Sequence, residues 1–252
     1  MSLSLRFLGT GAAEISELGH SAAVLERDGE PLLLIDCGPD VVPRFASTYG
    51  KLPPAIFLTH LHLDHIGGME AMFSRIMFHK PRLDPPTLFV HAALLPMMQG
   101  RLADYPGVAA EGGMNFWDAF RLVPCSRGFW HQGLWFDVFG TRHHRPGTSY
   151  GVALRGSFTY TGDTRPIPDI LEEVAAGGGP IAHDCGVHAN PSHTGVDDLD
   201  ALYPDALRER LVLYHYGKSE DAAALRARGY TVSDPGQAFA LPAPSPDPST
   251  TG

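Results

Sequence analysis

The residues best suited to chemistry gather in one short segment of this chain, Thr59-His60-Leu61-His62-Leu63-Asp64-His65. An apolar tetrapeptide comes directly before it and is predicted to be a strand. Because alternate residues of an extended chain share a direction, His60 and His62 can reach one metal ion. Asp64 and His65, after the bend, then face a second ion. The segment therefore predicts two adjacent metal sites.

Imidazole and carboxylate ligands suit zinc, manganese or iron, and we prefer zinc among them. A pair of such ions about 3.5 to 4 Å apart can hold both the attacking and the leaving oxygen of a hydrolysis. The alternative is a solvated histidine-rich loop. Four potential ligands at this spacing, directly after a strand and before Gly67-Gly68, favour the metal site. We expect a hydrolase that binds two divalent metal ions.

The run of His60, His62, Asp64 and His65 resembles the His-x-His-x-Asp-His motif of the metallo-β-lactamase superfamily. This resemblance implies an α/β fold, a four-layer αβ/βα sandwich with the metals at one edge of two sheets. The opening segment 8–11 is similar to that of the tRNase Z branch, and segment 34–38 resembles the motif that supports the metal loop. The resemblance thus implies that Asp36 positions the loop and is not itself a ligand.

The same resemblance implies three further metal ligands downstream. A third histidine for the first ion is expected within segment 141–151, where we choose His144 over His143. Asp163, in Tyr160-Thr161-Gly162-Asp163-Thr164, matches the aspartate that bridges both ions. His215 ends a predicted strand and would complete the second site. The implied ligands are His60, His62, His144 and Asp163 for one ion, and Asp64, His65, Asp163 and His215 for the other.

A water or hydroxide between the two ions would be the nucleophile, and the leaving group needs a proton from a nearby acid. The region 181–194 resembles the phosphodiesterase side of the superfamily. There we assign Asp184 to orient His193 as the general acid, with His188 as the substitute. The alternative is a loop of surface histidines. Asp64 is assigned to catalysis as well as to metal binding, and Arg145 and Arg165 are candidates for contact with a phosphate.

Charge and spacing separate this chain from enzymes that act on tRNA. In the tRNase Z branch, a long arm for tRNA lies between the Tyr-Gly strand and the Thr-Gly-Asp strand. Here only 12 positions separate Gly151 from Asp163. A formal charge of −9 with only three lysines also disfavours stable nucleic-acid binding. We expect a phosphodiesterase acting on a small phosphate diester; the alternatives are a lactone, thioester or amide hydrolase and a non-catalytic metal-binding module.

The elements that must position these residues follow from hydrophobic periodicity and turn signals. Strands are predicted at 3–8, 21–26, 32–36, 55–58, 87–90, 134–139, 151–154, 158–160, 180–184 and 211–214. Helices are predicted at 69–78, 92–102, 167–176 and 196–202. We expect one domain over residues 1–241 and a disordered tail, rich in proline, serine and threonine, over residues 242–252.

Composition indicates the solubility, the location and the partners to expect for this chain. With 44% hydrophobic residues and no run of about 20 apolar residues, we expect a soluble protein that does not interact with membranes. The first residues lack the pattern of a secretory signal, so we predict a cytoplasmic location. Three scattered cysteines disfavour both a disulfide framework and a thiolate zinc site. The expected partner is a small-molecule substrate, and a homodimer stays open.

Overall fold

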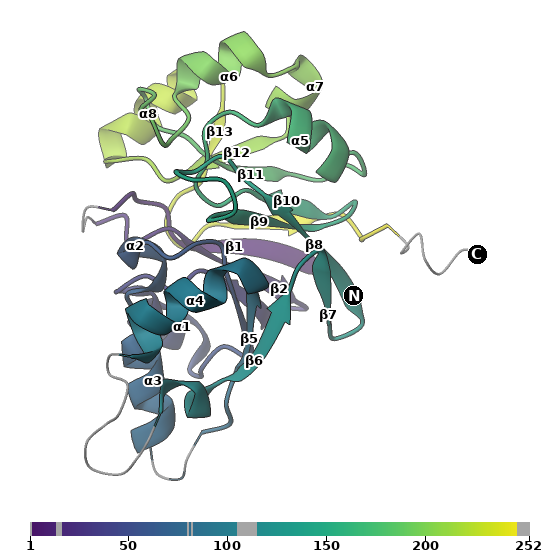
Figure 1. Cartoon of the computed structure of the whole chain (residues 1–252). Helices are drawn as coiled ribbons and strands as arrows, with labels where there is room; N and C mark the ends of the chain where they lie inside the picture. The colour runs from purple at the N-terminus through teal and green to yellow at the C-terminus, as the bar shows by residue number, and fades with distance from the viewer. Residues whose placement is uncertain (1, 14–16, 80, 82, 105–114, 246–252) are drawn as a thin grey trace.

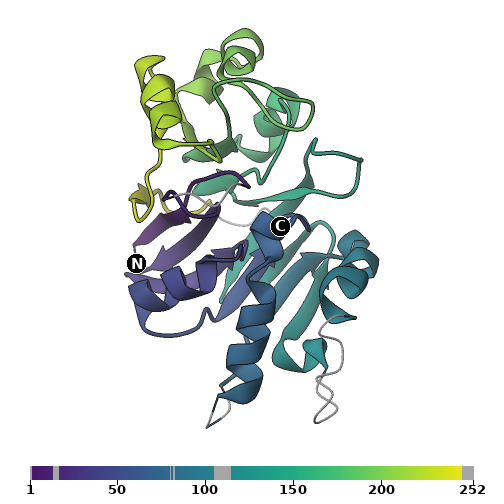
Figure 2. The same cartoon turned by 90° about the vertical axis from the view of Figure 1, so that its left-hand side faces the viewer.

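Two seven-stranded sheets stack face to face, with helices on the outer side of each (Figure 1). The computed structural model describes residues 2–13, 17–79, 81, 83–104 and 115–245. The four layers run helix, sheet, sheet, helix, and this arrangement confirms the predicted αβ/βα sandwich. The view turned by 90° shows the two groups of helices at opposite ends of the molecule (Figure 2).

The first sheet has the strand order β14-β1-β2-β3-β4-β5-β6. Its strands are β1 (Leu3–Gly9), β2 (Ala22–Arg27), β3 (Glu30–Ile35), β4 (Ala55–Leu58), β5 (Thr87–His91), β6 (Arg121–Cys125) and β14 (Ala238–Leu241). β14, β1, β2 and β3 pair antiparallel, whereas β3 to β6 pair parallel. Asp28 and Gly29 join β2 to β3 with φ of 52° and 82°, the paired positive values that a tight type I′ turn requires.

The second sheet has the order β13-β12-β11-β10-β9-β8-β7. Its strands are β7 (Gly128–His131), β8 (Leu134–Gly140), β9 (Tyr150–Leu154), β10 (Phe158–Tyr160), β11 (Ile181–Asp184), β12 (Leu211–Tyr214) and β13 (Thr231–Val232). β7 to β10 form antiparallel pairs, and β10 to β13 form parallel ones. The parallel half matters most for the site, because the carboxyl ends of parallel strands meet at the same sheet edge.

Helices from the first half of the chain cover the first sheet, and those from the second half cover the second sheet (Figure 1). The first set comprises α1 (Val41–Tyr49), α2 (Leu63–Ile66), α3 (Met69–Phe78), α4 (Leu95–Met98) and the short turns η1 (Ala92–Leu94), η2 (Gln99–Ala103) and η3 (Phe116–Ala119). The second set comprises α5 (Pro168–Val174), α6 (Val196–Leu202), α7 (Asp205–Arg208) and α8 (Ser219–Ala227).

Aromatic side chains fill the space between the two sheets. The ring of Phe129, on β7, stacks on Phe57 and Phe89 of the first sheet at centroid distances of 5.7 and 4.0 Å. Tyr160 on β10 and Tyr214 on β12, two strands of the second sheet that flank β11, stack at 4.7 Å and are fully buried. Burying each such ring contributes roughly 1.5 to 3 kcal/mol, so the two sheets are held at a fixed separation.

Backbone hydrogen bonds tie the sheets together where the metal-binding segment leaves β4. The amide of Tyr150, which begins β9, donates to the carbonyl of Thr59 at 2.9 Å. His60 and Ser149 form an isolated antiparallel bridge. Asp163 follows β10, and His215 follows β12. The fold therefore brings ligand candidates from both sheets to one edge.

Most of the predicted elements are present, with one clear difference in the middle of the chain. The predicted helix at 92–102 is a succession of a 3-10 turn, a single α-turn and a π-turn. Among the described residues, no helix has the length and apolar character needed to span a membrane. Residues 246–252 of the predicted tail lie outside the described residues. The amide of Ser245, near its start, donates to the carbonyl of Arg155 at 2.8 Å.

Candidate metal centre

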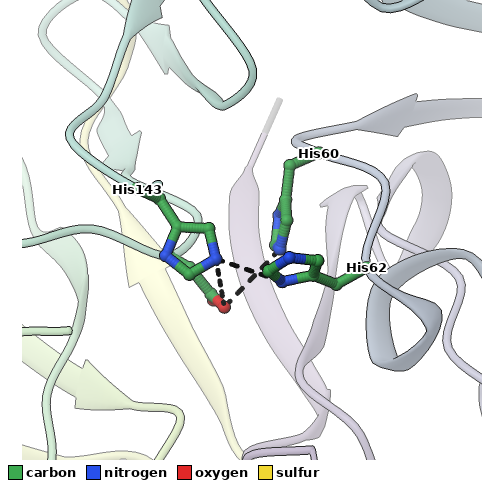
Figure 3. Close-up of side chains that lie close together, drawn as sticks. His60, His62 and His143 are labelled. Carbon is green, nitrogen blue, oxygen red and sulfur yellow. Dashed lines mark hydrogen bonds and ion pairs between the residues drawn. The ribbon is translucent and has the colours of Figure 1, made fainter. Parts of the chain in front are cut away.

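A first group of ligand atoms comes from His60, His62, His143 and Asp163, and these atoms all lie within 4.8 Å of one another. Figure 3 shows the three rings facing one another across a small gap. His143 Nε2 lies 3.1 Å from His62 Nδ1 and 3.8 Å from Asp163 Oδ2. Three imidazoles and one carboxylate at this spacing make a suitable site for a zinc-like ion.

A second group lies beside the first and shares one residue with it. Its members are Asp64, His65, Asp163 and His215, again with ligand atoms within 4.8 Å. His215 Nε2 lies 3.4 Å from Asp163 Oδ2 and 3.5 Å from Asp64 Oδ2. Asp163 Oδ1 lies 3.3 Å from His65 Nε2. Asp163 therefore stands between the two groups, where a bridging carboxylate would have to be.

The unpaired atoms of these groups test whether a metal ion fits. His60 Nε2, His65 Nε2 and Asp163 Oδ1 are buried and have no hydrogen-bond partner among the described residues. A buried polar atom without a partner costs free energy, so proteins rarely leave one unexplained. All three atoms belong to the clustered ligand sets. The residues present therefore fit a divalent metal site, and coordination would satisfy the orphaned atoms.

Hydrogen bonds on the other ring nitrogens hold the histidines in place. His65 Nδ1 lies 2.8 Å from Asp36 Oδ2, and His60 Nδ1 lies 3.0 Å from Thr59 Oγ1. Thr59 Oγ1 in turn donates to Asp36 Oδ2 at 2.8 Å. One buried carboxylate thus orients a ligand in each group, which leaves both Nε2 atoms facing the centre. Asp36 is where the sequence placed it, supporting the metal loop from outside the ligand sets.

Asp36 occupies an unusual backbone conformation, with φ of 63°. Aspartate and asparagine are enriched among the few non-glycine residues that adopt positive φ. The Thr59 amide donates to Asp36 Oδ1 at 2.8 Å and helps to hold that conformation. Burial raises the pKa of Asp36, and the adjacent His65 opposes that rise.

Burial and mutual charge set the protonation of the centre in the absence of metal. Burial alone would raise the pKa of Asp163, yet His215 and His65 hold it well below its usual range. Burial would likewise lower the pKa of His65, but Asp163 and Asp36 raise it well above the usual value. For His60, burial prevails and lowers the pKa well below the usual value. The cluster is therefore strongly coupled electrostatically.

The structure corrects the choice of the third histidine. His143 is buried and joins the first group, whereas His144 is exposed and belongs to none of the ligand groups found among the described residues. His144 has φ of 53°, and its ring packs edge-on against those of His143 and His62, at centroid distances of 4.3 and 4.8 Å. His143 Nδ1 is held by the carbonyl of Ser192 at 3.0 Å. We therefore replace His144 with His143 in the candidate ligand set.

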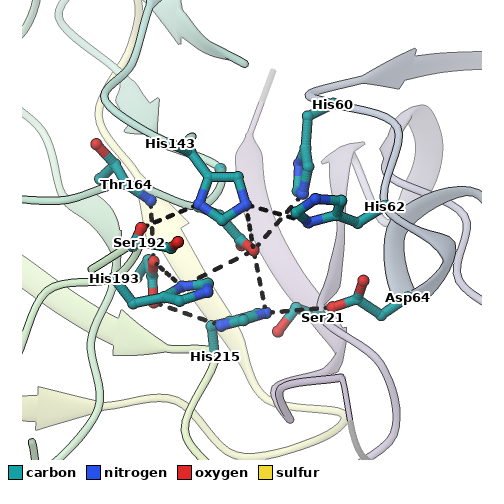
Figure 4. Close-up of polar contacts among 12 residues, drawn as sticks. Ser21, His60, His62, Asp64, His143, Thr164, Ser192, His193 and His215 are labelled. Atoms are coloured by element: carbon teal, nitrogen blue, oxygen red, sulfur yellow. Dashed lines mark hydrogen bonds and ion pairs between the residues drawn. The ribbon is translucent and has the colours of Figure 1, made fainter. Parts of the chain in front are cut away.

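His193, the residue assigned as the general acid, lies beside the metal-binding histidines (Figure 4). His193 Nδ1 lies 2.8 Å from Asp184 Oδ2 and 3.9 Å from Asp163 Oδ2. Burial lowers the pKa of His193, but Asp184 outweighs it and raises that pKa above the usual value. His188, the substitute candidate, is exposed and lines the same cleft. Only His193 of the two is hydrogen-bonded to Asp184.

A residue that sequence reasoning missed shapes the loop that carries His193. Asn190 Oδ1 accepts hydrogen bonds from the amides of Ser192, at 2.8 Å, and His193, at 3.0 Å. The carbonyl of Ser192 is the partner of His143. One tight turn therefore positions both a metal ligand and the proposed acid. The Asn190-Pro191 pair is a turn signal that could have identified it.

A cleft of about 520 Å³ opens onto the centre. The residues that line it include His62, Asp64, Asp163, His193 and His215 of the clustered groups, together with Lys218 and Asp221. Sites that hold a whole small molecule measure roughly 300 to 1,000 Å³. The cleft is therefore large enough for a small substrate in contact with both metal groups.

The chain is similar to known proteins in sequence and in fold. The family model described as "Anti-Pycsar protein Apyc1" matches residues 3–239. The Apyc1 protein of Paenibacillus harenae is 29% identical over 243 residues, covering 92% of this chain and 98% of that protein. That of Paenibacillus xerothermodurans is 31% identical over 228 residues, covering 86% and 88%. The metallo-β-lactamase fold protein YhfI of Bacillus subtilis superposes with a TM-score of 0.70 at 14% identity, covering 95% and 100% of the chains, and shares the fold.

Proposed function

The chain belongs to the anti-Pycsar protein Apyc1 family, and from that premise we propose that it is a metal-dependent phosphodiesterase that hydrolyses a small, cyclic phosphate diester. The centre would hold two divalent ions, with zinc preferred over manganese or iron. His60, His62, His143 and Asp163 would bind one ion, and Asp64, His65, Asp163 and His215 would bind the other.

The position of Asp163 is the observation that carries this proposal. It belongs to both metal groups, and the hydrogen-bonded pair of His193 and Asp184 lies directly beside it. A hydrolase of phosphate diesters needs positive charge around the reacting phosphate and an acid for the departing oxygen. Bound ions and His193 would meet these two requirements at one cleft, which Asp163 and His193 both line.

Each residue has a part in the reaction. The bound ions would supply Lewis-acid stabilisation of the phosphate and lower the pKa of the attacking water. Asp163 would hold the two ligand sets at a fixed separation, and Asp36 would fix the rings of His60 and His65. After that water has lost a proton to solvent, its oxygen would bond to phosphorus as the ester P–O bond breaks, and His193 would give its own proton to the departing alkoxide. Asp184 would stabilise the protonated ring.

A small substrate is favoured by the hairpin of the second sheet. β9 ends at Leu154 and β10 begins at Phe158, so only residues 155–157 connect them. A protruding RNA-binding arm has no place in that turn. The net charge of −9 also disfavours a nucleic-acid partner, since polyanions would be repelled at long range. We therefore propose a small-molecule substrate and no stable nucleic-acid partner.

Hydrolysis assays on the metal-loaded protein test the proposal. We expect activity on 3′,5′-cyclic nucleotides and on bis(p-nitrophenyl) phosphate, with little activity on lactones or thioesters. Activity on lactones, thioesters or amides alone would contradict the proposal and assign a carboxyl-group hydrolase to the same centre. A protein that binds zinc or manganese but cleaves none of these substrates would indicate a non-catalytic metal-binding module.

A further inference from the structure

A second, smaller cavity lies against the first group of histidines. Its volume is about 140 Å³, and it shares His62 with the main cleft. We call it the arginine pocket, and it is lined by residues 60–62 together with Met97, Arg101, His143, His144, Arg145 and Thr148. Sites that hold a whole small molecule measure roughly 300 to 1,000 Å³. The arginine pocket therefore suits one small group of a ligand, such as a single phosphate.

The two cavities differ in charge. Asp64, Asp163 and Asp221 line the main cleft, whereas the residues lining the arginine pocket include two arginines and no carboxylate. Within the described part of the chain, neither Arg101 nor Arg145 forms an ion pair. Guanidinium groups bind phosphate oxygens through paired, charge-assisted hydrogen bonds. Two of them without a counter-charge at one cavity favour an anion there.

The two metal groups are also unequal in charge. The first group contains three histidines and Asp163, whereas the second contains Asp64 as well as Asp163. Asp184 adds a further carboxylate on the side of the second group, with its Oδ1 3.4 Å from His215 Nδ1. With one divalent ion in each group, the first would keep the larger positive charge, and the arginine pocket adjoins it. Negative charge that forms at the centre is therefore attracted toward the arginine pocket.

Arg101 fixes the pocket relative to the metal-binding segment. Its Nη1 donates to the carbonyl of Leu61 at 2.9 Å, and Leu61 lies between His60 and His62. Arg101 belongs to η2, a π-turn, which is a local structure common at functional sites. A guanidinium has five N–H donors, so others remain for an anion beside His62.

We propose that the arginine pocket binds the phosphate group of the ring-opened product. This inference rests on the proposed function. In a cyclic diester both ester oxygens belong to one ring, so the phosphate is enclosed in that ring. Hydrolysis breaks one P–O bond, and the phosphate becomes a terminal group on a single ester oxygen. Its new P–OH group ionises with a pKa of about 6, so the product carries nearly two negative charges at pH 7, where the diester carries one.

Both changes favour the arginine pocket. A terminal phosphate can pass His62, which lines both cavities, while the rest of the product stays in the main cleft. The added negative charge strengthens its attraction to Arg101 and Arg145. The pocket would therefore bind the phosphate monoester that hydrolysis forms more tightly than the diester that enters.

Ligands that differ by one charge test the proposal. Calorimetry on the metal-loaded protein would compare adenosine 5′- and 3′-monophosphate, the two possible ring-opened products, with adenosine 5′-(methyl phosphate), which lacks the second charge. We expect Arg145→Gln to weaken binding of at least one monophosphate by about tenfold or more, the effect of one hydrogen bond to a charged group. Binding of the methyl ester should change less. Arg121→Gln, which removes the same charge from an exposed position on β6, should keep the wild-type affinities.

Product inhibition gives a kinetic readout of the same contact. Arg145→Gln should raise the inhibition constant of that monophosphate against a 3′,5′-cyclic nucleotide by a similar factor, and KM by less. Arg145-dependent binding of a monophosphate by a protein that hydrolyses no diester would contradict the phosphodiesterase and leave the pocket standing. Diester hydrolysis together with monophosphate affinities that Arg145→Gln does not change would overturn the pocket proposal. Arg145-dependent binding of inorganic phosphate alone would assign free phosphate to the pocket and overturn the product assignment.

Discussion

The adjacent residues His143 and His144 are expected to respond differently to the same substitution. His143 is buried among the first group of ligands, whereas the ring of His144 is exposed. We expect His143→Ala to lose bound metal and His144→Ala to retain the wild-type stoichiometry. Elemental analysis after gel filtration would measure both, with His79→Ala, on an exposed loop, as the control. Metal loss in the His144 variant alone would reverse the assignment.

Asp36 should control metal affinity without touching the metal. Asp36→Asn keeps a residue type that tolerates positive φ but replaces the carboxylate that orients His65 and, through Thr59, His60. Loss of such a supporting hydrogen bond costs about 10- to 100-fold in metal affinity. Competition with a chromogenic chelator would measure the change, and Asp137→Asn, on β8, is the control. Unchanged affinity would show that the rings are held by packing alone.

Residue types and spacing predicted His60, His62, Asp64 and His65 as candidate ligands, and the resemblance to the metallo-β-lactamase superfamily added Asp163 and His215. All six lie within the clustered ligand groups. The choice between His143 and His144 could not be made, because strand alternation does not apply where a residue has positive φ. The Asn190-Pro191 pair indicates a turn, but the role of Asn190 depends on contacts with backbone amides, which residue types do not specify.

At the scale of elements, the turn that Asn190 forms positions the proposed acid, His193. Loss of this turn should therefore matter most for leaving groups that need a proton. Asn190→Ala should slow hydrolysis of cyclic nucleotides, whose alkoxide needs a proton, by about tenfold or more, within the range of general-acid catalysis. Hydrolysis of bis(p-nitrophenyl) phosphate should change little, because nitrophenolate leaves unprotonated. Asn190→Asp, which keeps an acceptor for both amides, should restore most of the rate. Equal losses on both substrates would point to collapse of the centre instead.

The strands β1 and β2 carry a charged cluster whose contribution should depend on pH. Glu26 accepts from Arg6 Nε at 2.6 Å, Ser4 Oγ at 2.6 Å and Tyr49 Oη at 2.7 Å. Burial would raise the pKa of Glu26, but the bond to Arg6 leads the effects that lower it overall. A lowered folded-state pKa adds stability above the unfolded value of about 4.3, and this is lost as pH falls through the folded value.

Glu26→Gln should therefore cost about 1 to 3 kcal/mol of unfolding free energy at pH 7, and less below about pH 4. Urea denaturation of both proteins over this pH range would measure the difference. Comparing differences cancels the acid sensitivity of the metal centre, which both proteins share. A penalty that stays constant with pH would show that the carboxylate charge contributes nothing.

Elements with a clear period were predictable, and those shaped by tertiary contacts were not. The strand at 55–58 and the helix at 69–78 have the predicted bounds. β6, which includes Pro124, is largely exposed and shows no alternation, so its sequence carried no strand signal. Segment 92–103 has helical periodicity, but a local π-turn brings Arg101 to the Leu61 carbonyl.

For the whole molecule, removal of metal should lower thermal stability. Without ions, the buried ligand atoms of His60, His65 and Asp163 have no hydrogen-bond partner among the described residues. A ligand at 100 times its dissociation constant adds about 2.7 kcal/mol, which corresponds to roughly 5 to 10 °C for a protein of this size. Calorimetry with a chelator, and then with zinc or manganese restored, would measure the shift. An unchanged Tm in all three conditions would argue against a metal centre.

The two ends of the described chain meet in one sheet, since β14 pairs with β1. The segment after β1 also contacts His215, the last candidate ligand along the chain, because the amide of His215 donates to the carbonyl of Thr10 at 2.8 Å. During synthesis, β1 leaves the ribosome long before β14 exists, and the edge that pairs with β14 stays unpaired until some 230 residues later. The nascent chain must therefore keep the exposed edge of β1 from aggregating. It can complete its second metal group only after His215 has been synthesised.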